Sequence, residues 1–86
     1  MTNEEAKAYL KRRIKDNKEM IEGRIEFLVK EARLFIDNVQ EAKDDTRKKV
    51  DEVYDLLGTF RTHYGDIEAY NIRTGAYEVA LGLIEK

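Results

Sequence analysis

The chain has 86 residues without a single proline or cysteine, and its 16 basic and 18 acidic side chains give a formal net charge of −2. This length suits one domain, residues 1–86, near the lower size at which a chain buries its own core. The composition excludes disulfides and thiolate metal sites, and the balanced charge excludes the strong basic bias of a dedicated nucleic-acid binder.

Charged residues make up 40% of the chain, and because the net charge is small the two signs must be interspersed. Such mixing is typical of a solvated helical surface. The N-terminal segment MTNEEAKAYLKRR lacks the apolar stretch of a signal peptide, and no apolar run approaches the ~18 residues of a membrane span. We therefore expect a soluble, cytoplasmic protein that does not bind membranes.

The first half of the chain repeats apolar residues every seven positions. Thr2 and Glu5 match a capping box, which predicts a helix that starts near residue 3. One apolar row contains Ile14, Ile21, Leu28, Phe35 and Ala42. A companion row contains Ile25, Ala32 and Val39 and extends to Lys11 and Lys18. Together with Val29 and Ile36, these rows predict a helix whose apolar stripe is broad enough for a bundle.

The second half continues the same period. Its first row contains Val53, Phe60, Ile67, Thr74 and Leu81. Its second row contains Leu56, His63, Tyr70, Tyr77 and Ile84. The period passes through Gly58 and Gly65 without a shift, which favours helix across residues 60–66. Because this stretch is rich in weak helix formers, we expect it to be weakly formed or kinked.

Three arrangements of the chain are compatible with this pattern, two with a chain reversal and one without. The apolar rows are weakest near Thr46, where Asp44 or Asp45 could cap a second helix. A turn near residues 43–46 gives an all-α antiparallel hairpin with arms of ~60 Å. Alternatively, a break at 58–65 folds a short C-terminal helix back on a long one. A continuous rod is the third form, since ion pairs such as Asp44–Lys48 would support unbroken helix.

The width of the apolar stripe predicts self-association. A two-helix hairpin covers only one side of each stripe, so the other side needs a second surface. Pairing two hairpins into a four-helix bundle provides it. We therefore expect a homodimer.

His63 is the chain's only histidine, and Asp66 lies three residues after it on the same helical face. A His–Asp pair could act as a general base with its orienting acid. However, serine and cysteine nucleophiles are both missing from the sequence, and the residue spacings of common metal sites are missing too. We interpret His63 as a structural residue and expect no enzymatic activity, no cofactor and no metal.

The C-terminal half concentrates amphipathic aromatic residues. Tyrosine on an apolar row is typical of a partner-facing surface, because its hydroxyl needs a polar neighbour. The candidate interface for a protein partner comprises Phe60, His63, Tyr64, Tyr70 and Tyr77.

Two basic clusters give an alternative, nucleic-acid binding by a helical dimer. Their residues are Lys11, Arg12, Arg13, Lys15 and Lys18, and Arg47, Lys48 and Lys49. The first cluster could neutralise several phosphates, with Tyr9 able to stack on a base. The competing interpretation is an ordinary solvated helix face, since Glu19 and Glu22 follow at helical spacing.

The closing run GDIEAYNIRTGAYEVALGLIEK resembles the C-terminal helices of small accessory proteins common in bacteriophage and prophage genomes. The features shared are a glycine, an Ile/Tyr heptad and a Leu-Ile end. The resemblance implies a short regulator or inhibitor that acts by binding a host or phage macromolecule, and it transfers no functional residues.

Overall fold

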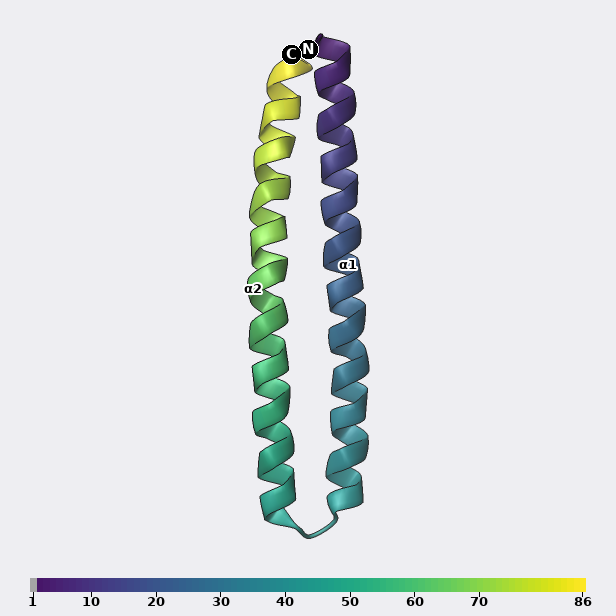
Figure 1. Cartoon of the computed structure of the whole chain (residues 1–86), viewed down its shortest axis with the longest axis vertical. Helices are drawn as coiled ribbons and strands as arrows, with labels where there is room; N and C mark the ends of the chain where they lie inside the picture. Colours follow the sequence, from purple (N-terminus) through teal and green to yellow (C-terminus); the bar gives the residue numbers. More distant parts are fainter. Residues whose placement is uncertain (1) are drawn as a thin grey trace.

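The computed structural model describes residues 2–86, which form two long helices, α1 (Asn3–Ala42) and α2 (Thr46–Ile84). They lie side by side in opposite directions as a rod with extents of 64 × 17 × 15 Å, and both termini lie at one end (Figure 1). The all-α antiparallel hairpin predicted from the sequence is confirmed. The chain reverses at residues 43–45, so the two alternatives, a break at 58–65 and a continuous rod, are wrong.

Both helices begin at the caps that the sequence indicates. The Thr2 hydroxyl accepts a hydrogen bond from the Glu5 amide at 3.1 Å. At α2, the Asp45 carboxylate accepts one from the Lys48 amide, also at 3.1 Å. Each side chain satisfies an amide that has no partner within its helix, which is the reason such residues favour these positions.

The turn is made by a tight four-residue loop. The Asp45 amide donates to the Ala42 carbonyl at 2.9 Å, and Lys43 has φ 52° and ψ −112°. These angles match the first central residue of a type II′ turn, a conformation that favours glycine. The ion pairs that would support unbroken helix here are weak surface interactions, and packing of the two arms outweighs them.

Helix α2 continues without interruption through residues 58–65, where the sequence predicts a weak or kinked stretch. The Thr62 hydroxyl donates to the Gly58 carbonyl at 3.0 Å, so this local polar group is satisfied within the helix. The helix persists because His63, in the middle of the stretch, is held against α1. Tertiary contact thus outweighs the low helix propensity of the segment.

On α1, one predicted row is confirmed and the other is partly wrong. Ile14, Ile21, Leu28, Phe35 and Ala42 are all half-buried. In the companion row, Lys11, Lys18 and Ile25 are exposed, while Ala32 and Val39 are half-buried. The second contact row lies one residue earlier and contains Leu10, Asn17, Arg24, Glu31 and Asn38. Helix α1 is therefore turned so that a largely polar second row approaches α2 beside the apolar one, and part of its apolar stripe faces away.

Helix α2 changes its contact row along its length. Leu56, His63, Tyr70, Tyr77 and Ile84 are half-buried, as predicted. Towards the termini Ile67, Thr74 and Leu81 join them, which also agrees with the prediction. Towards the turn Val53 and Phe60 are exposed, contrary to the prediction, and Glu52, Thr59 and Asp66 are the less exposed residues beside them.

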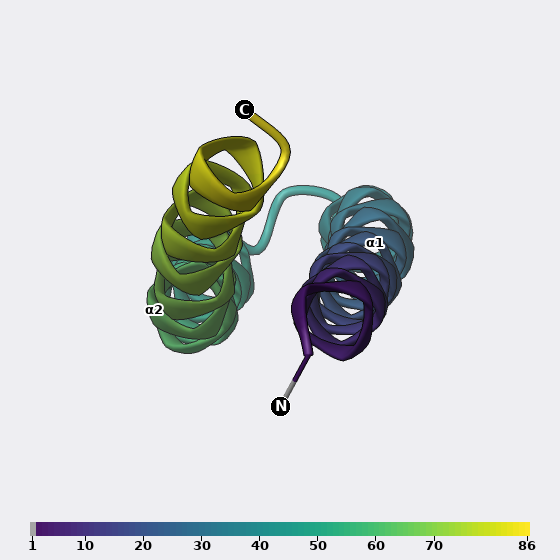
Figure 2. The same cartoon turned by 90° about the horizontal axis from the view of Figure 1, so that it is seen from above.

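The hairpin buries very little. Among residues 2–86, Leu10 is the only hydrophobic residue classed as buried, and the other two buried residues are the polar Asn17 and Thr74. The Thr74 hydroxyl donates to the Tyr70 carbonyl at 2.8 Å, whereas Asn17 Nδ2 has no hydrogen-bond partner. Seen end-on, two helices make up the whole cross-section, so no third element covers their outer surfaces (Figure 2). In the same described residues, neither helix has the length and apolar character to cross a membrane.

Replacing Lys43 with glycine should stabilise the hairpin. Lys43→Gly relieves the positive φ, and we expect a gain of about 1 kcal/mol in the free energy of unfolding after the extra backbone entropy of glycine is subtracted. Urea unfolding followed by circular dichroism measures it. Asp44→Gly is the matched control and should destabilise slightly, because Asp44 has no positive φ. Equal effects of the two variants would contradict this account of the turn.

Replacing Asn17 with leucine should also stabilise the protein. Burying an amide donor without a partner costs roughly 1–3 kcal/mol, and Asn17→Leu removes that donor from the contact between the helices. The midpoint of thermal unfolding at one fixed protein concentration should therefore rise. Asn38→Leu is the control and should not stabilise, because the Asn38 amide donates to Glu52 at 3.1 Å. A lower midpoint for Asn17→Leu would show that the amide is needed.

Candidate protein-binding face

One broad side of the hairpin carries apolar residues from both helices along the turn-proximal part of the rod. We call this surface the apolar face. It comprises Ile25, Val29, Ala32, Ile36 and Val39 of α1, and Val50, Val53, Leu57, Phe60, Tyr64 and Ile67 of α2. Successive members are three or four residues apart on each helix, which keeps each set on a single stripe.

Two grooves show that the stripes lie on the same side. The first groove, about 580 Å³, brings Lys11 and Lys18 of α1 beside Leu81 of α2. Residues seven apart lie on the same side of a helix in this hairpin. Ile25 is seven residues after Lys18, and Ile67 is fourteen residues before Leu81, so both stripes of the apolar face lie on the same side of the rod as the first groove. The second groove, about 390 Å³, lies there between Leu28 and the α2 residues Leu57, Phe60, Arg61, Tyr64 and Ile67.

The exposure of these side chains is high for apolar residues. Leu57 is 58% exposed and Ile36 is 52% exposed, and Val50 and Tyr64 exceed half as well. Single exposed apolar residues are ordinary, but a continuous stripe on two neighbouring helices is unusual, so we treat this face as the candidate interaction surface.

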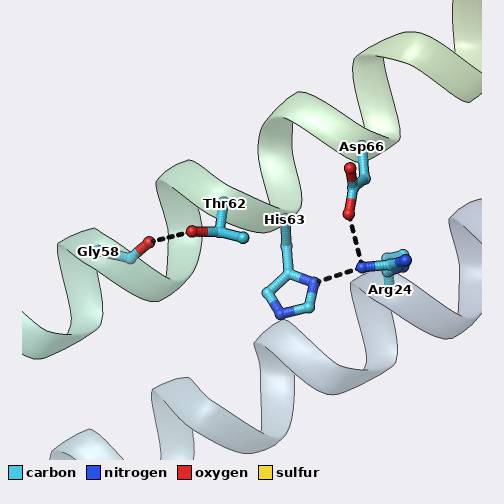
Figure 3. Close-up of polar contacts among 5 residues, drawn as sticks. All are labelled: Arg24, Gly58, Thr62, His63 and Asp66. Carbon is cyan, nitrogen blue, oxygen red and sulfur yellow. Dashed lines mark hydrogen bonds and ion pairs between the residues drawn. The ribbon is translucent and has the colours of Figure 1, made fainter.

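The opposite side of the rod is crossed by polar contacts, and we call it the polar face. Arg24 Nη1 donates to Asp66 Oδ2 at 2.7 Å and lies 3.1 Å from His63 Nδ1 (Figure 3). Nearer the turn, Asn38 pairs with Glu52. Hydrophobic residues occur here too, as Met20, Phe27 and Leu34 are exposed. They alternate with the polar pairs, so this face lacks the continuity of the apolar one.

His63 forms part of this polar cluster. Because Arg24 can only donate, His63 Nδ1 accepts and the ring proton is on Nε2. The Phe27 ring lies 4.6 Å from the imidazole, centroid to centroid. A His–Asp pair therefore does not form directly, since Arg24 Nη1 lies between the two side chains and contacts both.

The other candidate interface residues divide between two environments. Phe60 and Tyr64 are exposed on the apolar face, whereas Tyr70 and Tyr77 are half-buried between the helices. The Arg13 guanidinium lies 5.8 Å from the centre of the Tyr77 ring. The interaction with the Tyr77 side chain raises the pKa of Arg13 above its usual value.

The two basic clusters lie at opposite ends of the rod, as expected for the hairpin. Near the termini Lys11 pairs with Glu85 at 3.8 Å, and Lys18 with Glu78 at 3.7 Å. Near the turn Arg47 pairs with Asp51 at 3.4 Å. The remaining basic residues, Arg12, Arg13, Lys15, Lys48 and Lys49, belong to the same two ends. No single described surface therefore collects both clusters within one chain.

Sequence reasoning missed Val50 and Leu57 on the apolar face and Arg24 on the polar face. Val50 and Leu57 continue the row of Val53 and Phe60 at three- and four-residue spacing, so a wider count of apolar positions would have found them. Arg24 has the seven-residue spacing of Asn17 and Asn38, but a charged residue carries no hydrophobic signal. Only the pairing of the two helices reveals its role.

Comparison with protein-family models, with curated proteins and with solved structures gave no match. Among the described residues, no group of three or more His, Asp or Glu side chains is placed to hold a metal ion.

The Arg24–Asp66 pair should contribute measurably to stability. In a double-mutant cycle of Arg24→Gln and Asp66→Asn, we expect a coupling of about 0.5–1 kcal/mol that falls at high salt, since the Asp66 side chain is 48% exposed. Urea unfolding at one protein concentration measures it. The fully exterior pair Arg47–Asp51 is the control, with an expected coupling of at most about 0.5 kcal/mol. A larger coupling in the control pair would contradict this role for Arg24.

Proposed function

We propose that this chain is a small, non-enzymatic helical interaction protein of the cytoplasm that self-associates and acts by binding another protein. The observation that supports this most strongly is the apolar face, where two helices expose an unbroken apolar stripe. Water-exposed apolar surface of this extent is stabilised by contact with a second apolar surface. Phe60 and Tyr64 supply the aromatic side chains that commonly dominate such contacts.

The charge distribution favours a protein over a nucleic acid as the partner. In the groove beside the basic cluster Lys11, Lys15 and Lys18, the carboxylates of Glu19, Glu22 and Glu26 line the same surface. Acidic groups at that position repel phosphates and weaken the electrostatic attraction on which nucleic-acid binding depends. Nucleic-acid binding by the basic clusters is therefore the second candidate.

The biological role that fits a protein of this kind is regulation or inhibition. It has the size and shape to cover part of another protein, and the structure offers one long binding face. The resemblance of its C-terminal run to bacteriophage and prophage accessory proteins supports the same role, a phage-type regulator or inhibitor.

Capture of partners from the native host tests the proposal. Tagged wild-type protein should retain a protein partner after nuclease treatment and at raised salt. Leu57→Glu should lower the recovery at least about tenfold, because it places a charge within the apolar face. Leu34→Glu is the matched control on the polar face, 51% exposed compared with 58% for Leu57, and should leave recovery unchanged.

The same experiment identifies the second candidate. Nucleic-acid binding predicts capture that is lost with nuclease, falls steeply with salt and is abolished by Arg12→Glu combined with Arg13→Glu. If these losses occur while Leu57→Glu has no effect, the proposed protein-binding function is wrong.

A further inference from the structure

The apolar face needs an occupant that matches its length and its apolar character. We infer that a second copy of this chain covers it, with the turns of the two hairpins at the same end of a four-helix bundle. In this arrangement α1 of each copy packs on α2 of the other. The inference rests on the proposed function, because both assign the apolar face to a protein, and it names the first occupant of that face.

The single chain exposes more surface than a compact protein of its mass, and the excess is large enough for the interface of a stable dimer. The hairpin exposes 6743 Å². A compact monomer of 10.1 kDa would expose about 5,300 Å². The excess, about 1,400 Å² per chain, is larger than the ~800 Å² that each partner contributes to a standard interface and lies in the range of obligate homodimers.

The register of the helices aligns the two apolar stripes. The contacts Asn38–Glu52 and Arg24–Asp66 fix which residues are level along the rod. In this register Ile25 is level with Tyr64, and Val39 with Val50. A two-fold axis parallel to the rod keeps every level unchanged. It therefore places the α1 stripe of one copy directly on the α2 stripe of the other over the whole apolar face.

The reverse orientation, with turns at opposite ends, fits less well. With full overlap of the rods, Ile25 and Val29 of one copy would lie level with Lys18 and Lys15 of the other. Apolar residues would then face a charged stripe. If the two copies are instead shifted along the rod until their apolar faces meet, only the turn-proximal half of each hairpin is in contact. The groove around Ile14 and Leu81 would then stay open to water.

Charge complementarity at the terminal end favours the same-end arrangement. Within one chain, Lys11 reaches Glu85 and Lys18 reaches Glu78, which shows that these residues are level. A two-fold axis parallel to the rod places α1 of one copy against α2 of the other. Lys11, Lys15 and Lys18 of one copy then lie at the same height along the rod as Glu78 and Glu85 of the other. The lysines share this surface with Glu19 and Glu22, so the charges there are mixed. In this orientation, however, each lysine has a carboxylate of the other copy near its level, whereas in the reverse orientation the lysines lie level with apolar residues.

The first measurement is the mass in solution. Light scattering of the purified chain at micromolar concentration should give about 20 kDa, twice the 10.1 kDa of one chain. Leu57→Glu should raise the concentration needed for dimer formation at least about 100-fold, whereas the control Leu34→Glu should not change it. A mass of about 10 kDa for the wild type would overturn the inference and leave the face to a different protein. A dimer that is lost with Leu34→Glu but kept with Leu57→Glu would overturn the choice of face.

The second measurement is the orientation, and it requires no variant of the interface. Because the chain has no cysteine, Lys86→Cys places a single spin label on each copy at the terminal end. With the turns together, the two labels should lie within roughly 30 Å, since neighbouring bundle helices are about 8–10 Å apart. A separation near or above the 64 Å length of the rod would overturn the inferred orientation.

These two measurements use pure protein, so their failure is distinct from failure of the proposed function. A monomer, or a dimer with distant labels, contradicts the inference even if a host protein is captured through the apolar face. A dimer of the inferred orientation supports the inference even if the capture experiment recovers only nucleic acid.

Discussion

Two helices touch along a single line, and the rest of this structure depends on which residues occupy that line. Here the contact combines one apolar row on each helix with a row that is largely polar on α1 and, near the turn, on α2. Arg24 bridges to His63 and Asp66, and Asn38 bridges to Glu52. These pairs fix the register of the arms, and because they occupy one side of the contact, the apolar residues of the other stripe are turned outwards.

In this hairpin, the residues that set the register of the two helices differ from those that could supply most of the hydrophobic stabilisation. Polar pairs on partly exposed helices contribute little free energy, but they are directional, so they favour one register of the hairpin over its neighbours. The large apolar side chains contribute more when they are buried, and in the hairpin most of them are not. The single chain therefore has a well-defined shape with a small core, and most of its large apolar side chains remain in contact with water.

The apolar face and the polar face differ in continuity more than in composition. Phe27 and Leu34 are exposed on the polar face, yet the Arg24 cluster and the Asn38–Glu52 pair interrupt them. On the apolar face no such interruption separates Ile25 from Val39 or Val50 from Ile67. Arg61 lines the groove beside this stripe, so the proposed partner surface would lie mainly against apolar side chains with one guanidinium next to them.

The sequence by itself determined that the chain is helical and where the first helix begins, and it offered the hairpin as one of three arrangements, because these features depend on local chemistry and on a seven-residue period that any long amphipathic helix must show. Thr2 and Asp45 cap the helices because their side chains reach backbone amides three residues later. The concentration of aromatic residues also pointed to Phe60 and Tyr64 as candidate interface residues, and both are exposed in the structure. Only the tertiary structure decided which side of each stripe is used within the chain. Ile25 and Arg24 are neighbours in sequence, and a rotation of α1 by one residue would exchange them. The choice depends on contacts of Arg24 with Asp66 and His63 of the other helix, which are 42 and 39 residues away. A local sequence pattern cannot predict contacts between residues so far apart in the chain.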